Sequence, residues 1–201
     1  ADTVISELFR SSSDCDLADF DLDGYLDIFV ANRDHSNELY RNNGDGSFSR
    51  IDTGRIATDN RSSISCRWID YDEDGDPDVY VTNTYYENNF LYRNEGNARF
   101  TRIDTLSIST EGQHGSSCSW GDFDNDGDMD LFLSHANYGD NNYIYRNNGN
   151  GNFELLNDLP MRYDNRVSAA GAWGDIDNDG NLDLALSNGG WYTAQKNLLY
   201  L

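Results

Sequence analysis

One motif occurs four times along this chain of 201 residues, and this repetition constrains the fold more than any other feature. Each copy joins an acidic loop to a short apolar run, and the copies span residues 15–32, 66–83, 118–135 and 171–188. The loop glycines Gly24, Gly75, Gly127 and Gly180 are separated by 51, 52 and 53 residues. Repeats of about this length are typical of solenoids, propellers and arrays. The sequence therefore predicts a single repeat domain over residues 1–201, with units at approximately 1–51, 52–103, 104–156 and 157–201.

Each unit is predicted to form four short strands. The first carries Trp68, Trp120 or Trp173, except that Leu17 takes this place in the first unit. The second strand is the apolar run after the acidic loop, and the third contains a Leu-Tyr or Ile-Tyr pair. An Asn-Gly-type turn, a strong hairpin signal, precedes the fourth strand. No segment has a sustained helical period. We therefore expect an all-β fold, a β-propeller-type array of four four-stranded blades, with a generic β-sandwich as the alternative.

The acidic loops have the form D-x-D-x-D-G-x-x-D, which predicts cation sites. Four carboxylates within nine residues repel one another unless a cation lies among them. Positions 1, 3, 5 and 9 offer carboxylates, position 6 is the glycine of a sharp turn, and position 7 offers a backbone carbonyl. Such oxygen ligands suit Ca²⁺ better than Mg²⁺. The predicted ligands of about four Ca²⁺ ions are Asp19, Asp21, Asp23, Tyr25 and Asp27; Asp70, Asp72, Asp74, Asp76 and Asp78; Asp122, Asp124, Asp126, Asp128 and Asp130; and Asp175, Asp177, Asp179, Asn181 and Asp183.

The loop matches an EF-hand only over its first half. An EF-hand has a bidentate Glu at position 12 and flanking helices. Position 12 here is Val30, Val81, Leu133 or Leu186, within an apolar strand. We therefore expect a strand–loop–strand site closed by the Asp at position 9. The alternative is a set of solvated Asp-rich turns without metal.

The acidic loop, its apolar strand and the following N-x-LYRN-x-G-x-x-x-F pattern together resemble the FG-GAP/VCBS repeat, the repeat of integrin α-subunit propellers and of many secreted bacterial proteins. The resemblance covers nearly the whole chain. It implies Ca²⁺ in the loops, a β-propeller of most often seven blades, and adhesion, ligand binding or scaffolding rather than catalysis. The chain departs from the family in having four units and in having Leu17 in place of a Trp.

The last unit ends at Leu201, before its turn and its closing aromatic residue. Residues 2–8, with the strand-forming segment Thr3–Ser6, could supply its outer strand and close a four-bladed ring. The same strand could instead pair with a neighbouring chain, and such head-to-tail pairing gives a filament when it does not close. The third alternative is that the chain is a slice of a longer propeller. The sequence leaves these three alternatives open.

The charge of the chain limits its partners. With 14 basic and 36 acidic residues the formal net charge is −22, which argues against binding nucleic acid or anionic membrane surfaces. No apolar run reaches the roughly 20 residues of a membrane helix. Ala1 is followed directly by polar residues, without the pattern of a secretory signal, so we expect a processed, secreted or cell-surface form. No catalytic constellation or phosphate loop is found, and we expect no enzyme activity.

These observations favour a non-enzymatic, calcium-stabilised extracellular module for adhesion or assembly, such as a subunit of a surface structure or filament. One alternative is a lectin, whose glycan sites would use aromatic residues that follow the second strands, namely Tyr85, Tyr86, Tyr138, Trp191 and Tyr192. Another is a non-catalytic propeller region of a larger secreted protein. The sequence does not identify the protein or glycan partner.

Overall fold

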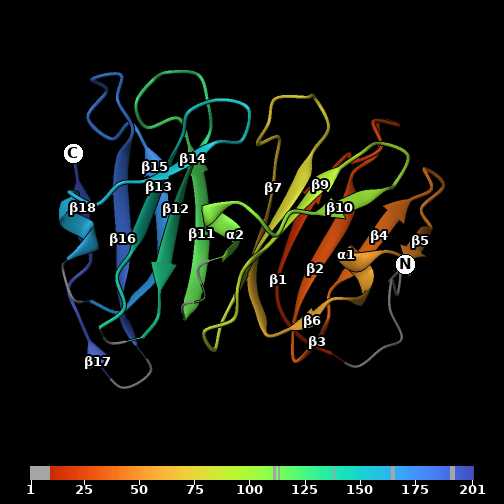
Figure 1. The fold of residues 1–201 in the computed structure, drawn as a ribbon, viewed down its shortest axis with the longest axis horizontal. Helices are drawn as coiled ribbons and strands as arrows, with labels where there is room; N and C mark the ends of the chain where they lie inside the picture. Colours follow the sequence, from red (N-terminus) through yellow and green to blue (C-terminus); the bar gives the residue numbers. More distant parts are fainter. Residues whose placement is uncertain (1–9, 111, 113, 138, 164–165, 191–192) are drawn as a thin grey trace.

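The computed structural model describes residues 10–110, 112, 114–137, 139–163, 166–190 and 193–201. The described chain is all-β, with four antiparallel sheets in chain order (Figure 1). The first sheet contains β1 (Ser11–Ala18), β2 (Asp27–Arg33), β4 (Glu38–Asn42) and β5 (Phe48–Ile51). The second contains β7 (Ser63–Ile69), β8 (Asp78–Asn83), β9 (Phe90–Asn94) and β10 (Phe100–Arg102). The third contains β11 (Gly115–Gly121), β12 (Asp130–His135), β13 (Tyr143–Asn147) and β14 (Phe153–Leu155).

The fourth sheet differs from the others at its outer edge. It contains β15 (Ser168–Gly174) and β16 (Asp183–Gly190), and β16 pairs on its other side with both β17 (Thr193–Ala194) and β18 (Leu198–Tyr200). The strand that would pair outside β18 was predicted at residues 2–8, which lie outside the described residues. The four-strand pattern is therefore confirmed for the first three units.

Each sheet is built by the same local rules. The first and second strands pair antiparallel with a register shift at the same place in all four sheets, as between Ser12 and Asp14 in the first. The second strands β8 and β12 are buried at every position, whereas β2 has intermediate or exposed positions as well. A strand that is buried on both faces has a continuous apolar sequence, rather than one in which apolar and polar residues alternate. The two central sheets are thus covered on both sides.

The sheets form a row in which the first strands lie next to one another: β1 contacts β7, β7 contacts β11, and β11 contacts β15. A hydrophobic cluster fills each space between consecutive sheets. Trp68 lies parallel to Phe20, with ring centroids 6.0 Å apart, and Trp173 lies in the same way on Phe123, also at 6.0 Å. The packing between sheets therefore repeats along with the sequence. The first and fourth sheets lie at opposite ends of the row, which is open across the described residues (Figure 1).

Helical segments are short and connect sheets. They are α1 (Arg55–Thr58), α2 (Ser107–Thr110) and the 3₁₀ turn η1 (Pro160–Arg162), each too short to leave a helical period in the sequence. A small additional pairing of β3 (His35–Ser36) with β6 (Asn60–Arg61) links the first two repeats. Within the described chain, no helix combines the length and the apolar character that membrane crossing requires.

Candidate metal centres

Four groups of aspartates lie along one edge of the molecule, where each first strand turns into the second (Figure 1). In every group three carboxylate oxygens, one from each residue, lie within 4.8 Å of one another. The groups are Asp19, Asp21 and Asp27; Asp70, Asp72 and Asp78; Asp122, Asp124 and Asp130; and Asp175, Asp177 and Asp183. The predicted ligands at positions 1, 3 and 9 thus converge in all four loops.

The first aspartate of each loop also holds the loop in shape. In the first repeat Asp19 Oδ1 accepts the backbone N–H of Asp23 at 2.9 Å, and its Oδ2 accepts that of Gly24 at 2.8 Å. The same pair of bonds occurs in the other three loops. Gly24 has a φ of 93°, and its counterparts range from 91° to 101°, a left-handed region that glycine enters without steric cost. The fixed glycine at position 6 is therefore a backbone requirement of the loop.

The ninth aspartate joins the loop to the sheet. Asp78 accepts backbone N–H groups from Tyr71 at 3.3 Å and from Asn94, on the third strand, at 2.7 Å. Asp27 and Asp130 accept from the equivalent positions, and Asp183 accepts from Ile176 in the loop at 2.8 Å. Each of these carboxylates lies at the first position of a second strand. A cation held there would be tied to the loop and to two strands at once.

The Asn that follows the Tyr-Arg pair of the third strand was missed as part of the site. Its side chain also crosses between repeats: Asn94 Nδ2 donates to the carbonyl of Phe20 at 2.8 Å, and Asn147 Nδ2 donates to that of Tyr71 at 3.0 Å. The sequence does carry a signal for this role, because an Asn occupies the same position in three units. These bonds connect the second and third sites to the loop of the preceding repeat.

Burial opposes the ionised form of the ninth aspartate. It raises the pKa of Asp78 to about 8 and that of Asp130 to about 6, against an ordinary value of 3.8, although backbone N–H groups act in the opposite direction. Burial raises the pKa of Asp27 too. The neighbouring loop carboxylates add to each of these shifts. An opposite charge within a few ångström would favour the ionised form, so the first three sites are electrostatically suited to a cation.

Two of the grouped aspartates each carry one carboxylate oxygen without a hydrogen-bond partner in the described chain. Asp21 Oδ1 and Asp72 Oδ1 are buried and have no hydrogen-bond partner. A buried polar atom without a partner loses its hydration without compensation. These are the carboxylates at position 3 of their loops, which were predicted to bind metal. The all-oxygen donor set fits a hard cation, and Ca²⁺ accepts such an irregular oxygen shell more readily than Mg²⁺ does.

The aspartate at position 5 has a different role in the structure. In each loop its Oδ1 accepts the backbone N–H of the residue at position 7: Asp23 from Tyr25 at 3.0 Å, Asp74 from Asp76 at 3.0 Å, Asp126 from Asp128 at 3.0 Å and Asp179 from Asn181 at 2.8 Å. It is not part of the three-carboxylate groups. Metal ligation at positions 5 and 7 stays a prediction.

Arg41 is a further residue that the sequence reasoning missed. Its guanidinium pairs with Asp21 and also donates to Asp23 at 3.0 Å, so it lies over the first loop. The corresponding arginines of the next two repeats pair elsewhere: Arg93 with Glu95 and Arg146 with Glu154, both at 2.7 Å. For Arg93, the sequence signal of a different ion-pair partner is the acidic residue two positions later.

Comparison with known proteins gives two findings. The sequence model of the FG-GAP-like repeat matches residues 19–81, 70–133 and 132–186. Among curated proteins, Cartilage acidic protein 1 of Xenopus tropicalis is 30% identical over 172 residues, that of Mus musculus 28% over 174, and that of Homo sapiens 26% over 172. Each match covers 81% of this chain and 26% of the relative, so the chain spans about a quarter of the length of these proteins.

Proposed function

Because the chain belongs to the FG-GAP-like repeat family, we propose that it is a non-enzymatic, calcium-stabilised module of an extracellular protein, with a role in adhesion or assembly. The observation that carries the proposal is the recurrence of one three-aspartate group at the same strand ends in all four repeats. The relatives' shared name refers to cartilage, which supports an extracellular location. The net charge of −22 supports a requirement for cations.

Calcium would act by coupling the loops to the sheets. Each ion would compensate carboxylates that otherwise repel one another, and would fix the connection between a first and a second strand. Four ions would change the formal charge from −22 to −14, since each adds two positive charges. Because Asn94 and Asn147 join neighbouring loops, order imposed on one loop would be transmitted to the next. The row of sheets would thereby become a rigid surface.

Isothermal titration and thermal unfolding test the calcium role. We expect about four ions to bind, at roughly 10⁻⁴–10⁻³ M, the range of extracellular calcium modules. We expect EGTA to lower the melting temperature, because a ligand that binds only the folded state stabilises it. No calcium uptake together with unchanged melting in EGTA would overturn the proposal.

The packing of the sheets supports a propeller-type array that takes part in assembly. The outer face of the first sheet has a hollow of about 590 Å³, lined by Leu17, Ile28, Val30 and Cys15 together with Ser12, Ser13 and Asp14. The positions equivalent to Ile28 and Val30 in the second repeat, Val79 and Val81, are buried against the first sheet. The outer face of the fourth sheet likewise exposes Leu199. Each outer face thus resembles one half of the interface that joins consecutive sheets.

Two forms of assembly follow. Further repeats of a larger secreted protein could cover the outer faces, and the match to a quarter of each relative favours this form. Alternatively, chains could associate end to end. Negative-stain microscopy of the purified chain in millimolar calcium tests self-assembly: filaments or large rings would support it, whereas single small particles would count against it and would fit a chain that closes on itself or a region of the larger protein.

A further inference from the structure

Two consecutive tyrosines on the edge opposite the metal loops have an unfavourable backbone conformation. Tyr85 has a φ of 59° and Tyr86 a φ of 61°, in the left-handed region that residues with a bulky side chain seldom enter. Their side chains are 62% and 57% exposed, so burial does not compensate for this conformation. A glycine or asparagine would fit the turn at lower cost. The two exposed rings are therefore free to contact a ligand at the surface.

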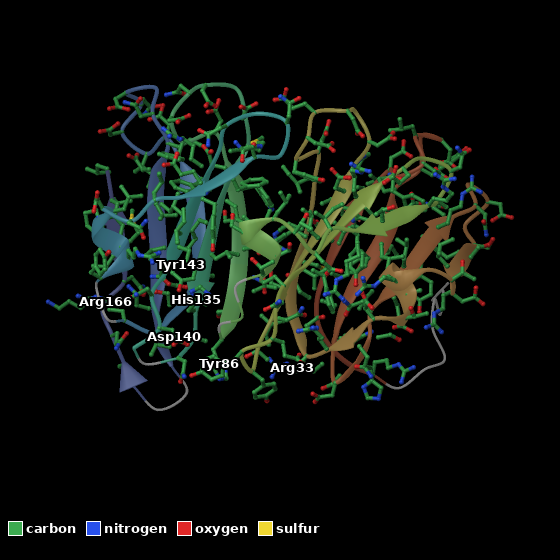
Figure 2. The ribbon with its side chains drawn as sticks, viewed as in Figure 1. Arg33, Tyr86, His135, Asp140, Tyr143 and Arg166 are labelled. Carbon is green, nitrogen blue, oxygen red and sulfur yellow. The ribbon has the colours of Figure 1, made fainter. Side chains whose placement is uncertain are left out.

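The rings are held in place by their surroundings. Tyr86 meets the edge of His114, with centroids 4.4 Å apart, and its hydroxyl accepts a hydrogen bond from Asn137 Nδ2 at 2.9 Å. Tyr85 contacts the same imidazole at 5.7 Å. His114 is fixed in turn by Thr84, whose Oγ1 lies 3.1 Å from Nδ1. Figure 2 shows Tyr86 at this lower edge, where the second strands end. The pair is therefore preorganised, so a ligand would not have to order it.

Tyr85 borders a hollow of about 350 Å³ between the first two repeats. The other groups that line it are polar, namely Asp34, Asn60, Arg61, Ser62 and Glu87. They supply a carboxylate, an amide and a guanidinium beside an exposed aromatic ring.

Arg61 is the most informative of these groups. Its guanidinium lies over the ring of Phe90, 5.5 Å from the centroid, and it forms no ion pair with a described carboxylate. Its N–H donors are positioned by stacking and remain available at the hollow.

We infer that the hollow beside Tyr85 binds a neutral saccharide. The exposed ring would stack against the apolar C–H face of a sugar ring, while Asp34 and Arg61 would accept from and donate to its hydroxyls. The mixture of donors and acceptors fits hydroxyl groups, which act as both. Acidic glycans are disfavoured because Asp34, Glu87 and the net charge of −22 would repel them. The volume accommodates a mono- or disaccharide unit.

The test is saturation-transfer NMR and isothermal titration with glucose, galactose, mannose, N-acetylglucosamine and their short neutral oligomers, in millimolar calcium. We expect saturable binding of at least one of these probes. Tyr85→Gly should weaken it at least about tenfold by removing the stacking ring. Tyr85→Phe, which keeps the ring, should bind within about twofold of the unaltered chain. Tyr163→Ala, at another exposed tyrosine, should leave binding unchanged.

The same variants separate binding from folding. Because glycine adopts a φ of 59° freely, Tyr85→Gly should unfold at the same temperature as the unaltered chain or higher, even though it loses the sugar. Failure of every neutral probe to bind at about 20 mM would overturn the inference. Equal binding by Tyr85→Gly would overturn it too, because the sugar would then lie elsewhere. Neither result depends on the metal loops, which occupy the opposite edge.

Discussion

The first and second repeats share one sequence plan but differ in what surrounds them. Trp68 of the second repeat packs on Phe20 and Phe29, whereas Leu17, at the same place in the first, is 53% exposed. Burial raises the pKa of Asp78 to about 8, while Asp27 has a raised pKa and a guanidinium near its loop. The carboxylates of the same loop motif are therefore stabilised differently in the two repeats. The difference depends on whether a preceding sheet buries the loop and on whether an arginine neutralises part of its charge.

The largest difference is expected at the Trp/Leu position. Trp68→Leu should destabilise the chain by about 3 kcal/mol, because a cavity would open among the Phe20, Phe29 and Phe100 rings. Leu17→Trp should change the free energy of unfolding by less than about 0.5 kcal/mol, since no residue of the described chain covers this position to receive the ring. Denaturant unfolding in calcium measures both. A gain from Leu17→Trp as large as the loss from Trp68→Leu would show that the first face is covered.

Replacement of the ninth aspartate tests the metal centres themselves. In calcium, Asp78→Asn should remove one bound ion and cost about 3 kcal/mol. About 1.4 kcal/mol of this is the stabilisation that the bound ion provides when free calcium is ten times the dissociation constant. The rest arises because the N–H₂ group of the new asparagine faces a backbone N–H, which is also a donor. Asp27→Asn should also remove one ion but cost less, because Arg41 continues to bridge Asp21 and Asp23.

The control for these two variants is the same stability measurement on metal-free protein. In EGTA at pH 7, Asp78→Asn should cost much less than it does in calcium, since a carboxyl with a pKa of about 8 is already largely protonated there. If the variant lost the same stability with and without calcium, Asp78 would be a structural residue and not a ligand.

Much of this comparison could not be predicted from the sequence. The spacing of the loops predicted the strands and which end of each sheet carries the aspartates, because a repeated pattern fixes its own register. The spacing did not separate the roles of Asp21 and Asp23, because these roles depend on the backbone between them. Leu22 has a φ of 58°, and the Asp21 carboxylate lies in the three-carboxylate group while that of Asp23 accepts the backbone N–H of Tyr25.

Contacts between repeats were also beyond sequence reasoning. The pairing of His35 with Arg61 joins segments whose patterns gave no strand signal. Arg41 and Arg93 occupy equivalent places in the same LYRN pattern, yet only Glu95 offers a nearby competing partner. Such choices depend on side-chain distances and not on periodicity.

The pH dependence of metal-free stability should differ from that of the calcium form. The pKa of Asp78 is raised in the folded state, so its contribution to stability is full below the unfolded value near 4 and is lost as pH rises through about 8. The slope is at most about 1.4 kcal/mol per pH unit. Thermal unfolding in EGTA from pH 4 to 9 should show this decline, and Asp78→Asn should reduce it.

Calcium should reverse the trend, because the ion favours the ionised carboxylate. Titration at pH 7 in buffers of different ionisation enthalpy should show protons released on binding, and fewer from Asp78→Asn. A heat of binding independent of the buffer would contradict the assignment of Asp78 as a ligand that is protonated without metal.

The smallest expected effect separates the two arginines. Arg41→Ala should raise calcium affinity at the first loop about two- to fivefold, the range expected for loss of an exposed competing pair with Asp21 and Asp23. It should also make the metal-free chain less stable, because the carboxylates would then lack any counter-charge. Arg93→Ala is the matched control: it removes a pair with Glu95 and an electrostatic interaction with Asp72 that is not an ion pair, so it should change affinity at the second loop less than Arg41→Ala does at the first. If Arg41→Ala weakened calcium binding instead, the guanidinium would be a support of the site, and the distinction between the two repeats would rest on burial alone.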